Sequence, residues 1–319
     1  MHIAIIGAGI AGLTAANDLR DAGIPCTVFE KSRGLGGRMA TRRTDSAAFD
    51  HGAQYVTARS VRFRSLLEHW RNEGTAAEWL PGKWVGTPGM TAPARSLARN
   101  LRVVSACRIS GLTGKPGAWQ LAADAPTPVS IEPNVFDAVV LAMPAPQIVP
   151  LAASAGAHFS ELDRVHYAPC LTLMLGFDSP VAMHELFITP ADGPLAWISH
   201  NSSKPGRASL PDTIVAQATP GWSREHIDAP IDLITQALLH AVSSHIGSAT
   251  PTTSMVQRWR YARVEQAAGV ACLWDPDNRI GACGDWALGA RVECAFDSGA
   301  ALASAIIGTV TPVAATKQR

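Results

Sequence analysis

The sequence is poor in charge and shows no electrostatic preference for a partner. Of its 319 residues, 17% are charged and 47% are hydrophobic, and the formal net charge is +1. A charged fraction below the roughly 25% of typical soluble proteins indicates a large buried core and argues against disorder. The near-neutral balance gives no reason to expect nucleic acid or an anionic membrane as a partner.

A metal-binding cysteine pattern and a long hydrophobic run are also missing. None of the six cysteines forms CxxC or stands at zinc-finger spacing from histidines, so we expect no metal site and reduced, packed thiols. The most apolar stretch, residues 135–157, contains Asp137, Gln147 and three prolines, which excludes a spanning helix. No basic, cleavable leader precedes the first strand, and we therefore expect a cytoplasmic protein.

The chain begins with a βαβ pattern typical of dinucleotide binding. Residues 2–6 and 26–29 are apolar like strands, and residues 10–21 have helical spacing, ended by Gly23. Glycines stand between the first strand and the helix as GxGxxG, where they allow a tight turn and close approach of a pyrophosphate: Gly7, Gly9 and Gly12. Glu30 follows the second strand, where an acceptor for a ribose hydroxyl belongs.

The rest of the chain is predicted to run from a β-rich middle back to α/β structure. Strands are expected over residues 101–109, 138–141, 172–177, 186–188, 195–199, 214–218 and 281–283, and helices over 63–72, from 223, 228–245 and 292–307. A nucleotide-binding domain interrupted by a substrate domain produces this order. We assign residues 1–60, 98–150 and 265–319 to the first domain, and residues 61–97 and 151–264 to the second.

Two further segments favour FAD over NAD. The stretch after Glu30 resembles the extension, ending in Gly36-Gly37-Arg38, that is found in amine-oxidase-like flavoproteins. Bare glycines there allow a turn over the pyrophosphate, and Arg38 offers a fork of donors. Asp285, in a Cys-Gly-Asp-Trp sequence after a strand, matches the same branch. We therefore expect an FAD-binding Rossmann domain of glutathione-reductase type, interleaved with a β-rich substrate domain, and noncovalent FAD.

A resemblance to one family covers nearly the whole chain. Residues 50–59, DHGAQYVTAR, resemble a segment of the renalase family, especially its bacterial members. Similar matches occur at residues 84–90 (WVGTPGM), 142–147 (AMPAPQ), 197–205 (WISHNSSKP), 258–263 (RWRYAR) and 284–293 (GDWALGARVE). The resemblance implies an oxidase for dihydro-NAD(P) isomers that carry hydride at position 2 or 6 of the nicotinamide. The products are NAD(P)+ and, with O2, hydrogen peroxide.

The resemblance also implies a set of contacts. Residues expected to hold FAD are Gly7, Gly9, Ala11, Gly12, Glu30, Lys31, Gly37, Arg38, Gln54, Tyr55, Ile109, Asp285 and Val292. Residues expected to contact substrate are Tyr55, Val56, Thr57, Ala58, Arg59, Pro88, Gly89, Met90, Asn201 and Arg291. No general base is required, because loss of hydride gives the aromatic cation directly. Catalysis then depends on holding the hydride-donating carbon of the substrate against flavin N5. We assign this positioning to Tyr55, Arg59, Asn201 and Arg291.

Several interpretations stay open at this point. Arg59 and Arg291 could equally form surface ion pairs, and His51 fits a neutral, partly buried histidine better than a catalytic one. Four tryptophans could wall a pocket or simply pack in the core: Trp197, Trp259, Trp274 and Trp286. A flavin amine oxidase or a desaturase is an alternative function, although none of the five lysines falls in a predicted core strand. A non-catalytic flavin-binding protein is a second alternative.

Overall fold

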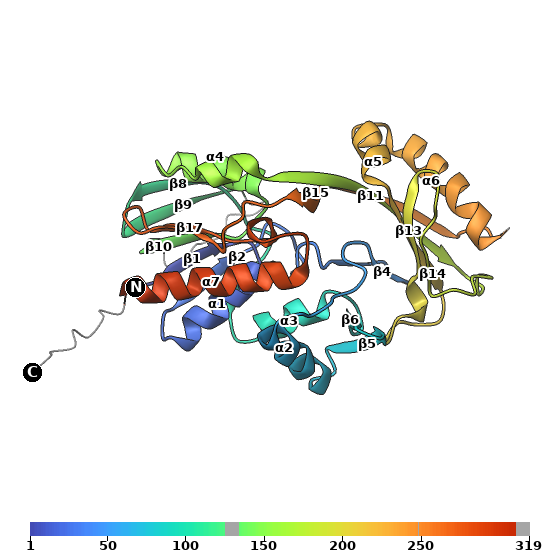
Figure 1. The fold of residues 1–319 in the computed structure, drawn as a ribbon, viewed down its shortest axis with the longest axis horizontal. Helices are drawn as coiled ribbons and strands as arrows, with labels where there is room; N and C mark the ends of the chain where they lie inside the picture. The colour runs from blue at the N-terminus through green and yellow to red at the C-terminus, as the bar shows by residue number, and fades with distance from the viewer. Residues whose placement is uncertain (125–133, 248, 311–319) are drawn as a thin grey trace, which may run out of the picture. The chain divides into compact units, whose positions relative to one another are not determined.

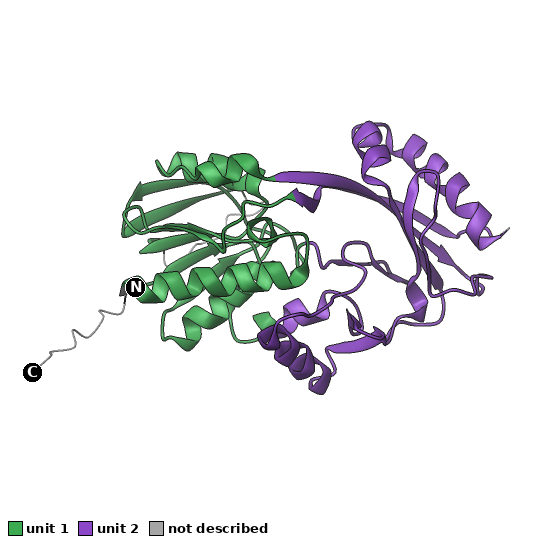
Figure 2. Ribbon diagram, viewed as in Figure 1, with its two compact units in different colours: residues 1–37, 97–165, 266–319 green, residues 38–96, 166–265 purple. Residues whose placement is uncertain are grey.

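The computed structural model describes residues 1–124, 134–247 and 249–310 (Figure 1). The chain divides into two compact units (Figure 2). Unit 1 comprises Met1–Gly37, Leu97–Val165 and Gln266–Arg319, and unit 2 comprises Arg38–Ser96 and His166–Glu265. The first division thus falls inside the Gly36-Gly37-Arg38 sequence and not near residue 60. Which ligand each domain binds stays a prediction.

Unit 1 is built on a six-stranded sheet. The strand order is β16-β17-β10-β1-β2-β7, and the pairs are parallel except for β16 with β17. Both central strands are buried along their whole length, as expected for a parallel sheet covered on two faces. The strands are β1 (Ile3–Ile6), β2 (Cys26–Phe29), β7 (Arg102–Val104), β10 (Ala138–Leu141), β16 (Leu273–Asp275) and β17 (Ile280–Ala282).

Two helices of unit 1 pack at backbone distance. A Cβ at Gly299 in α7 (Val292–Val310) would lie 2.2 Å from the carbonyl oxygen of Ala11 in α1 (Ile10–Asp21). Only glycine fits at such a contact. Strand β8 (Arg108–Lys115), which forms a hairpin with β9 (Ala118–Asp124), packs against α4 (Ala145–Ser154). The short helix η1 (Ser160–Arg164) follows α4, and η3 (Asp285–Ala287) precedes α7.

Unit 2 contains a five-stranded sheet in the order β12-β13-β14-β11-β15. Its strands are β11 (His166–Phe177), β12 (Phe187–Ile188), β13 (Leu195–His200), β14 (Asp212–Ala218) and β15 (Thr253–Gln266). Helix α6 (Ile231–Ile246) buries Ile234, Leu238, Val242 and Ile246, a four-residue spacing that places all of them on one face against the sheet. Helix α5 (Pro220–His226) precedes it.

The remaining elements of unit 2 lie outside its five-stranded sheet. They are β3 (Thr41–Arg43) paired with β4 (Ala48–Asp50), α2 (Val61–Asn72), β5 (Ala76–Leu80) paired with β6 (Lys83–Gly86), and η2 (Asn201–Ser203). Helix α3 spans Ala92–Ala98. Among the described residues, no helix is both long and apolar enough to cross a membrane.

The sequence predictions of the βαβ unit are confirmed to within a residue, and the strand over residues 138–141 is confirmed. The single strand expected over residues 101–109 is wrong. It is two strands, β7 and β8, separated by a loop in which Ala106 takes a positive φ of 55°. A run of apolar residues does not reveal such a break. Strand β15 and the β5–β6 hairpin were not predicted, because their charged and half-exposed residues obscure the strand periodicity.

We expect Gly299→Ala to destabilise the protein by about 1–3 kcal/mol, because the added methyl group must push α7 away from the backbone of α1. Gly308→Ala is the matched control in the same helix. A Cβ there meets no atom within 4 Å, so helix propensity alone should make this variant neutral or slightly more stable. Urea unfolding of both variants checks this, and equal stabilities would contradict the described packing.

Candidate functional site

The turn after β1 in unit 1 has the geometry of a phosphate-binding loop. Gly7 has a φ of +113°, and a Cβ there would lie 2.2 Å from the carbonyl oxygen of Ala142. A Cβ at Gly12 would lie 2.1 Å from the carbonyl oxygen of Gly7. At Gly9, which caps α1 without a side chain, a Cβ would meet no atom within 4 Å. The N–H groups in the first turn of α1 have no carbonyl acceptor within the helix, and the space beside Gly9 is open. These donors can therefore bind an anion.

Glu30 ties the end of β2 to this loop. Its side chain is 6% exposed, and its two carboxylate oxygens accept hydrogen bonds from the N–H groups of Ala8 at 3.0 Å and Ser32 at 2.8 Å. Each oxygen keeps a further lone pair, so the carboxylate can also accept from a ribose hydroxyl. Glu30 thus lies beside the loop, where the predicted acceptor for a ribose hydroxyl should lie.

The glycine extension after Glu30 folds back over the same loop. Gly36 donates its N–H to the carbonyl oxygen of Ala8 at 2.9 Å, and a Cβ at Gly37 would lie 3.7 Å from the Cα of Gly9. Gly36 and Gly37 have φ values of +99° and +54°, which favour glycine at both positions. The predicted bare turn beside the phosphate loop is thus present.

The other predicted contacts of unit 1 lie in several different elements. Lys31 is exposed and donates to Gln147, whereas Ile109 is buried in β8. Asp285 is buried in η3, just before α7 begins at Val292. Arg291 donates to the buried carboxylate of Glu293 at 2.8 Å, so the ion pair left open by the sequence is formed.

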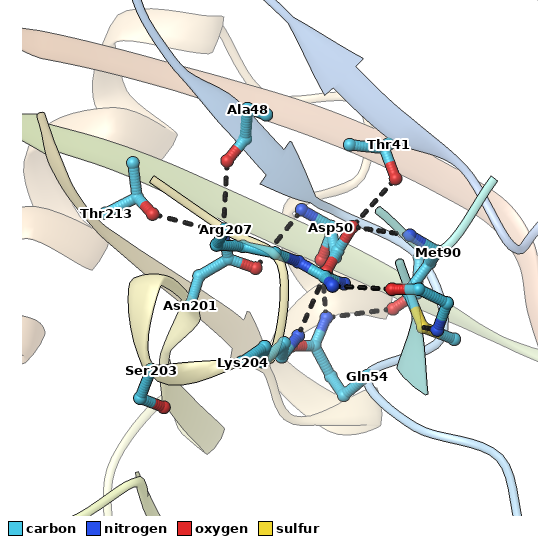
Figure 3. Close-up of polar contacts among 12 residues, drawn as sticks. Thr41, Ala48, Asp50, Gln54, Met90, Asn201, Ser203, Lys204, Arg207 and Thr213 are labelled. Carbon is cyan, nitrogen blue, oxygen red and sulfur yellow. Dashed lines mark hydrogen bonds and ion pairs between the residues drawn. The ribbon is translucent and has the colours of Figure 1, made fainter. Parts of the chain in front are cut away.

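Unit 2 contains a second cluster, centred on the fully buried carboxylate of Asp50 (Figure 3). Oδ1 accepts from the hydroxyl of Thr41 at 2.7 Å and from the N–H of Met90 at 3.0 Å. Oδ2 faces the guanidinium of Arg207 at 2.5 Å and the Nζ of Lys204 at 3.5 Å. One carboxylate therefore joins three segments that lie far apart in the sequence. We call these residues the Asp50 centre.

Lys204 of this centre is 2% exposed and also holds the side chain of Gln54. Its Nζ donates to Gln54 Oε1 at 3.1 Å, while Gln54 Nε2 donates to the carbonyl oxygens of Asp50 at 2.7 Å and Gly52 at 3.0 Å. Both ends of the amide are engaged, and its orientation is fixed. Gln54 is a predicted FAD contact whose position depends on a lysine that the sequence analysis did not assign to the site.

The charges of the centre shift one another's ionisation. Burial would raise the pKa of Asp50, but Lys204, Arg207 and the Met90 N–H outweigh it and lower the pKa to about 2. Burial lowers the pKa of Lys204 to about 8, with Asp50 opposing this shift and Arg207 adding to it. Near neutral pH, Asp50 is therefore ionised, and Lys204 is largely protonated.

Two predicted substrate contacts belong to this centre or touch it. Asn201 is fully buried, and its amide accepts from the Asp50 N–H at 3.4 Å and donates to Ala48 and Thr213. Met90 is fully buried as well. Both residues therefore support the Asp50 centre from within the protein. Their direct contact with a ligand stays a prediction.

The predicted substrate segment after Gln54 is more accessible. Val56 is buried and pairs with Trp84, whereas Tyr55, Thr57 and Ala58 are half-buried and Arg59 is exposed. Pro88 is exposed and Gly89 is buried. Arg38 belongs to unit 2, where it lies 5.9 Å from the ring centroid of Tyr167.

His51 is the neutral, buried histidine favoured by the sequence. It stacks on Trp259 with ring centroids 5.2 Å apart, and burial, assisted by Arg42, lowers its pKa to about 4. Of the other tryptophans left open, Trp286 is fully buried core and donates to Met143, and Trp274 lies in β16 of unit 1. Trp197 stacks on Phe187.

Sequence reasoning missed the Asp50 centre as a site. Asp50 and Lys204 both stood in segments quoted for the family resemblance, but they were not assigned roles. A charged residue flanked by glycine, serine and proline looks like a surface loop, and Arg207 lies two residues beyond the quoted segment. Only their approach in space identifies them.

Comparisons with known proteins agree with this geometry. Residues 5–70 match the NAD(P)-binding Rossmann-like domain, and residues 65–307 match the flavin containing amine oxidoreductase family. Among curated proteins, a 4,4'-diapophytoene desaturase of Staphylococcus haemolyticus is 43% identical over 68 residues, which are 21% of this chain and 13% of the desaturase. The match therefore covers only a small part of that relative.

Solved structures resemble the chain over nearly its whole length. A protein from Exiguobacterium sp. 255-15, provisionally assigned as a protoporphyrinogen oxidase, has a TM-score of 0.74 and 15% identity, covering 96% of this chain and 98% of that chain. A putrescine oxidase bound to putrescine has a TM-score of 0.70 and 12% identity, covering 97% and 99%. At these identities the likeness shows the fold alone, and the expected FAD-binding α/β fold class is confirmed.

FAD is the cofactor, and the residues of unit 1 fit its dinucleotide half. The close contacts at Gly7 and Gly12, the open backbone at Gly9 and the carboxylate of Glu30 form a cradle for a pyrophosphate and a ribose. These residues, together with Gly37, are the ones that would hold the cofactor there. When bound, FAD supplies a two-electron acceptor to the site.

We expect Glu30→Gln to weaken FAD binding about tenfold. The amide offers one acceptor oxygen in place of two, so one of the two loop N–H groups loses its partner. Asp21→Asn, at the exposed end of α1, is the control and should leave the affinity unchanged. Fluorescence titration of apoprotein with FAD measures both, and an unaltered Kd for Glu30→Gln would remove Glu30 from the cofactor site.

We expect Asp50→Asn to lower the free energy of unfolding at pH 7 by about 3–5 kcal/mol, because Lys204 and Arg207 lose their buried counter-charge. Since the pKa of Asp50 in the folded protein lies below the ordinary 3.8, its ionisation stabilises the fold above about pH 4. About 2 kcal/mol of this contribution is lost as the pH falls from 4 to 2.

Urea unfolding between pH 3 and pH 7 tests this linkage. The difference between wild type and Asp50→Asn should shrink toward low pH. Asp228→Asn removes an exposed carboxylate that also pairs with an arginine, and it should change stability little at any pH. A difference that does not depend on pH would contradict the assignment of the charge to Asp50.

Proposed function

Because the chain belongs to the flavin containing amine oxidoreductase family, we propose that it is an oxidase of renalase type, which acts on dihydro-NAD(P) isomers reduced at position 2 or 6. The observation that supports this most is the Asp50 centre. Three segments that resemble the renalase family, residues 50–59, 84–90 and 197–205, contribute groups to one buried carboxylate. A shared anchor for these segments is expected if they act together.

The proposed overall reaction converts dihydro-NAD(P), O2 and a proton to NAD(P)+ and hydrogen peroxide. The chemistry that FAD supplies is acceptance of a hydride from the nicotinamide and transfer of the electron pair to oxygen. The chain then needs to supply only orientation and exclusion of water. We assign orientation to Tyr55 and Arg59, which follow the fixed Gln54, and to Arg291.

The Asp50 centre acts on this task indirectly. Lys204 fixes the Gln54 amide, and the Met90 N–H holds the neighbouring loop to the same carboxylate. Met90 and Asn201 are positioning residues in this proposal, since neither side chain is exposed. We assign no proton transfer to His51, because burial lowers its pKa to about 4 and makes it a weak base, and the reaction needs no base.

A flavin amine oxidase or desaturase is the second candidate. The family match and the short similarity to a desaturase favour it. Lys204 favours it as well, because this lysine is fully buried and contacts Gln54, a predicted FAD contact. The two candidates differ in the charge of their substrates, and a direct reduction experiment separates them.

We expect anaerobic mixing of the FAD-loaded protein with 6-dihydro-NAD or 2-dihydro-NAD to bleach the flavin absorbance near 450 nm within seconds, at about one equivalent per flavin. The ordinary 4-dihydro isomer is the control, and it should react at least about a hundredfold more slowly, since a displaced hydride carbon misses the near-attack geometry. Admission of oxygen should restore the spectrum and release hydrogen peroxide.

Reduction by putrescine or another primary amine, while both isomers leave the flavin oxidised, would replace the renalase proposal by the amine oxidase. A flavin that responds to neither class of donor would favour the non-catalytic flavin-binding protein.

A further inference from the structure

A group of aromatic rings and one lysine lies in unit 2 beside the Asp50 centre. Phe187 and Trp197 stack with ring centroids 4.2 Å apart and an interplanar angle of 10°. Tyr55 approaches Trp197 at 5.8 Å, and Trp79 approaches Phe187 at 6.0 Å. The Nζ of Lys83 lies 5.5 Å from the ring centroid of Tyr55 and 6.0 Å from that of Phe187. We call these five residues the aromatic–lysine cluster.

Most of the cluster is accessible. Tyr55, Lys83, Phe187 and Trp197 are half-buried, and only Trp79 is buried, at 9% exposure. The cluster is supplied by β5, β6, β12 and β13 and by the segment that follows Gln54. It therefore rests on paired strands and on a segment that the Asp50 centre fixes, which gives its rings defined positions.

The cluster holds hydrogen-bond donors without acceptors. Within the described part of the chain, Lys83 forms no ion pair with a carboxylate, and Glu78 of the same hairpin accepts a hydrogen bond from the Gly82 N–H. The buried indole Nε1 atoms of Trp79 and Trp197 also have no partner there. The half-buried ammonium of Lys83, beside aromatic faces, is the donor in this cluster that an acceptor-rich group can reach.

The charges decide which ligands fit. Aromatic faces attract cations, but here they already face cations: Lys83 over Tyr55 and Phe187, and Lys204 at 5.6 Å from the ring centroid of Trp79. A cationic amine that entered the cluster would be repelled by both ammonium groups. A planar ring that carries a phosphate would instead gain stacking from the rings and a charge-assisted contact from Lys83.

We propose that the aromatic–lysine cluster binds the phosphate-bearing nicotinamide portion of the substrate, and that Lys83 selects this anionic ligand against cationic amines. This inference rests on the proposed oxidation of dihydro-NAD(P) isomers and extends it to the residue that discriminates by charge. Lys83 is a specificity-determining residue in this scheme and takes no part in hydride transfer.

The test uses the FAD-loaded protein and two oxidised probes that differ by one phosphate, nicotinamide mononucleotide and nicotinamide riboside. Isothermal titration should show that the wild type binds the mononucleotide at least about tenfold more tightly than the riboside. Lys83→Met should remove most of this difference by weakening only the mononucleotide, and Lys83→Arg should restore it. Lys115→Met, at an exposed position in β8, is the matched control and should behave as the wild type.

Ionic strength provides a second readout. Raising the salt from about 0.05 M to 0.5 M should weaken mononucleotide binding to the wild type more than to Lys83→Met, since screening acts on the contact that the variant lacks. Equal loss of both probes in Lys83→Met would mean that Lys83 only supports the fold, and unchanged binding of both would remove it from the site. Either result overturns the inference.

These binding measurements are separate from the test of the proposed function. If dihydro isomers fail to reduce the flavin but Lys83 still discriminates the two probes, the charge selection stands and the reaction does not. If the flavin is reduced by the isomers but Lys83→Met binds both probes as the wild type does, the reaction stands and the assignment of Lys83 fails.

Discussion

The interaction on which unit 2 depends is the pairing of the Asp50 carboxylate with Lys204 and Arg207. Burying an ion without compensation costs several kcal/mol, so a fully buried carboxylate must meet cations and N–H donors. The partners available are a hydroxyl before it, a backbone amide forty residues after it, and two cations in the loop between β13 and β14. Satisfying one charge therefore specifies how three segments of chain meet.

The same centre leaves an excess of positive charge, because two cations face one anion. The Lys204 ammonium is partly stabilised by a hydrogen bond to Gln54 Oε1 and by the ring of Trp79. Lys83 adds a further cation over neighbouring rings. Within unit 2, the surroundings of Tyr55 thus combine aromatic faces with uncompensated positive charge, a combination that suits a planar anionic ligand better than an amine.

Unit 1 meets a different constraint, which is steric and not electrostatic. Its phosphate loop requires glycine where the backbone turns against Ala142 and against itself, and the turn at Gly36 and Gly37 requires it again. Glu30 then holds the loop from the neighbouring strand. Apart from the contact with Ala142, these demands act between residues close in sequence, so a ligand for the loop could be inferred before any tertiary contact was known.

The sequence by itself determined the βαβ unit and the dinucleotide loop, since glycine spacing, strand periodicity and the acid after β2 act within thirty residues. FAD was inferred from two further segments, Gly36-Gly37-Arg38 and the sequence around Asp285. It also predicted α6 and most strands of the second sheet from their apolar spacing. The break at Ala106 and the strand β15 escaped it, because a positive φ and a polar strand leave no periodic signal. Only the tertiary structure decided that Lys204 and Arg207 meet Asp50, more than 150 residues away, and that Lys83 lies over Tyr55 and Phe187. The stability of a buried charge and the character of the cluster depend on those long-range approaches, which residue type and spacing do not encode.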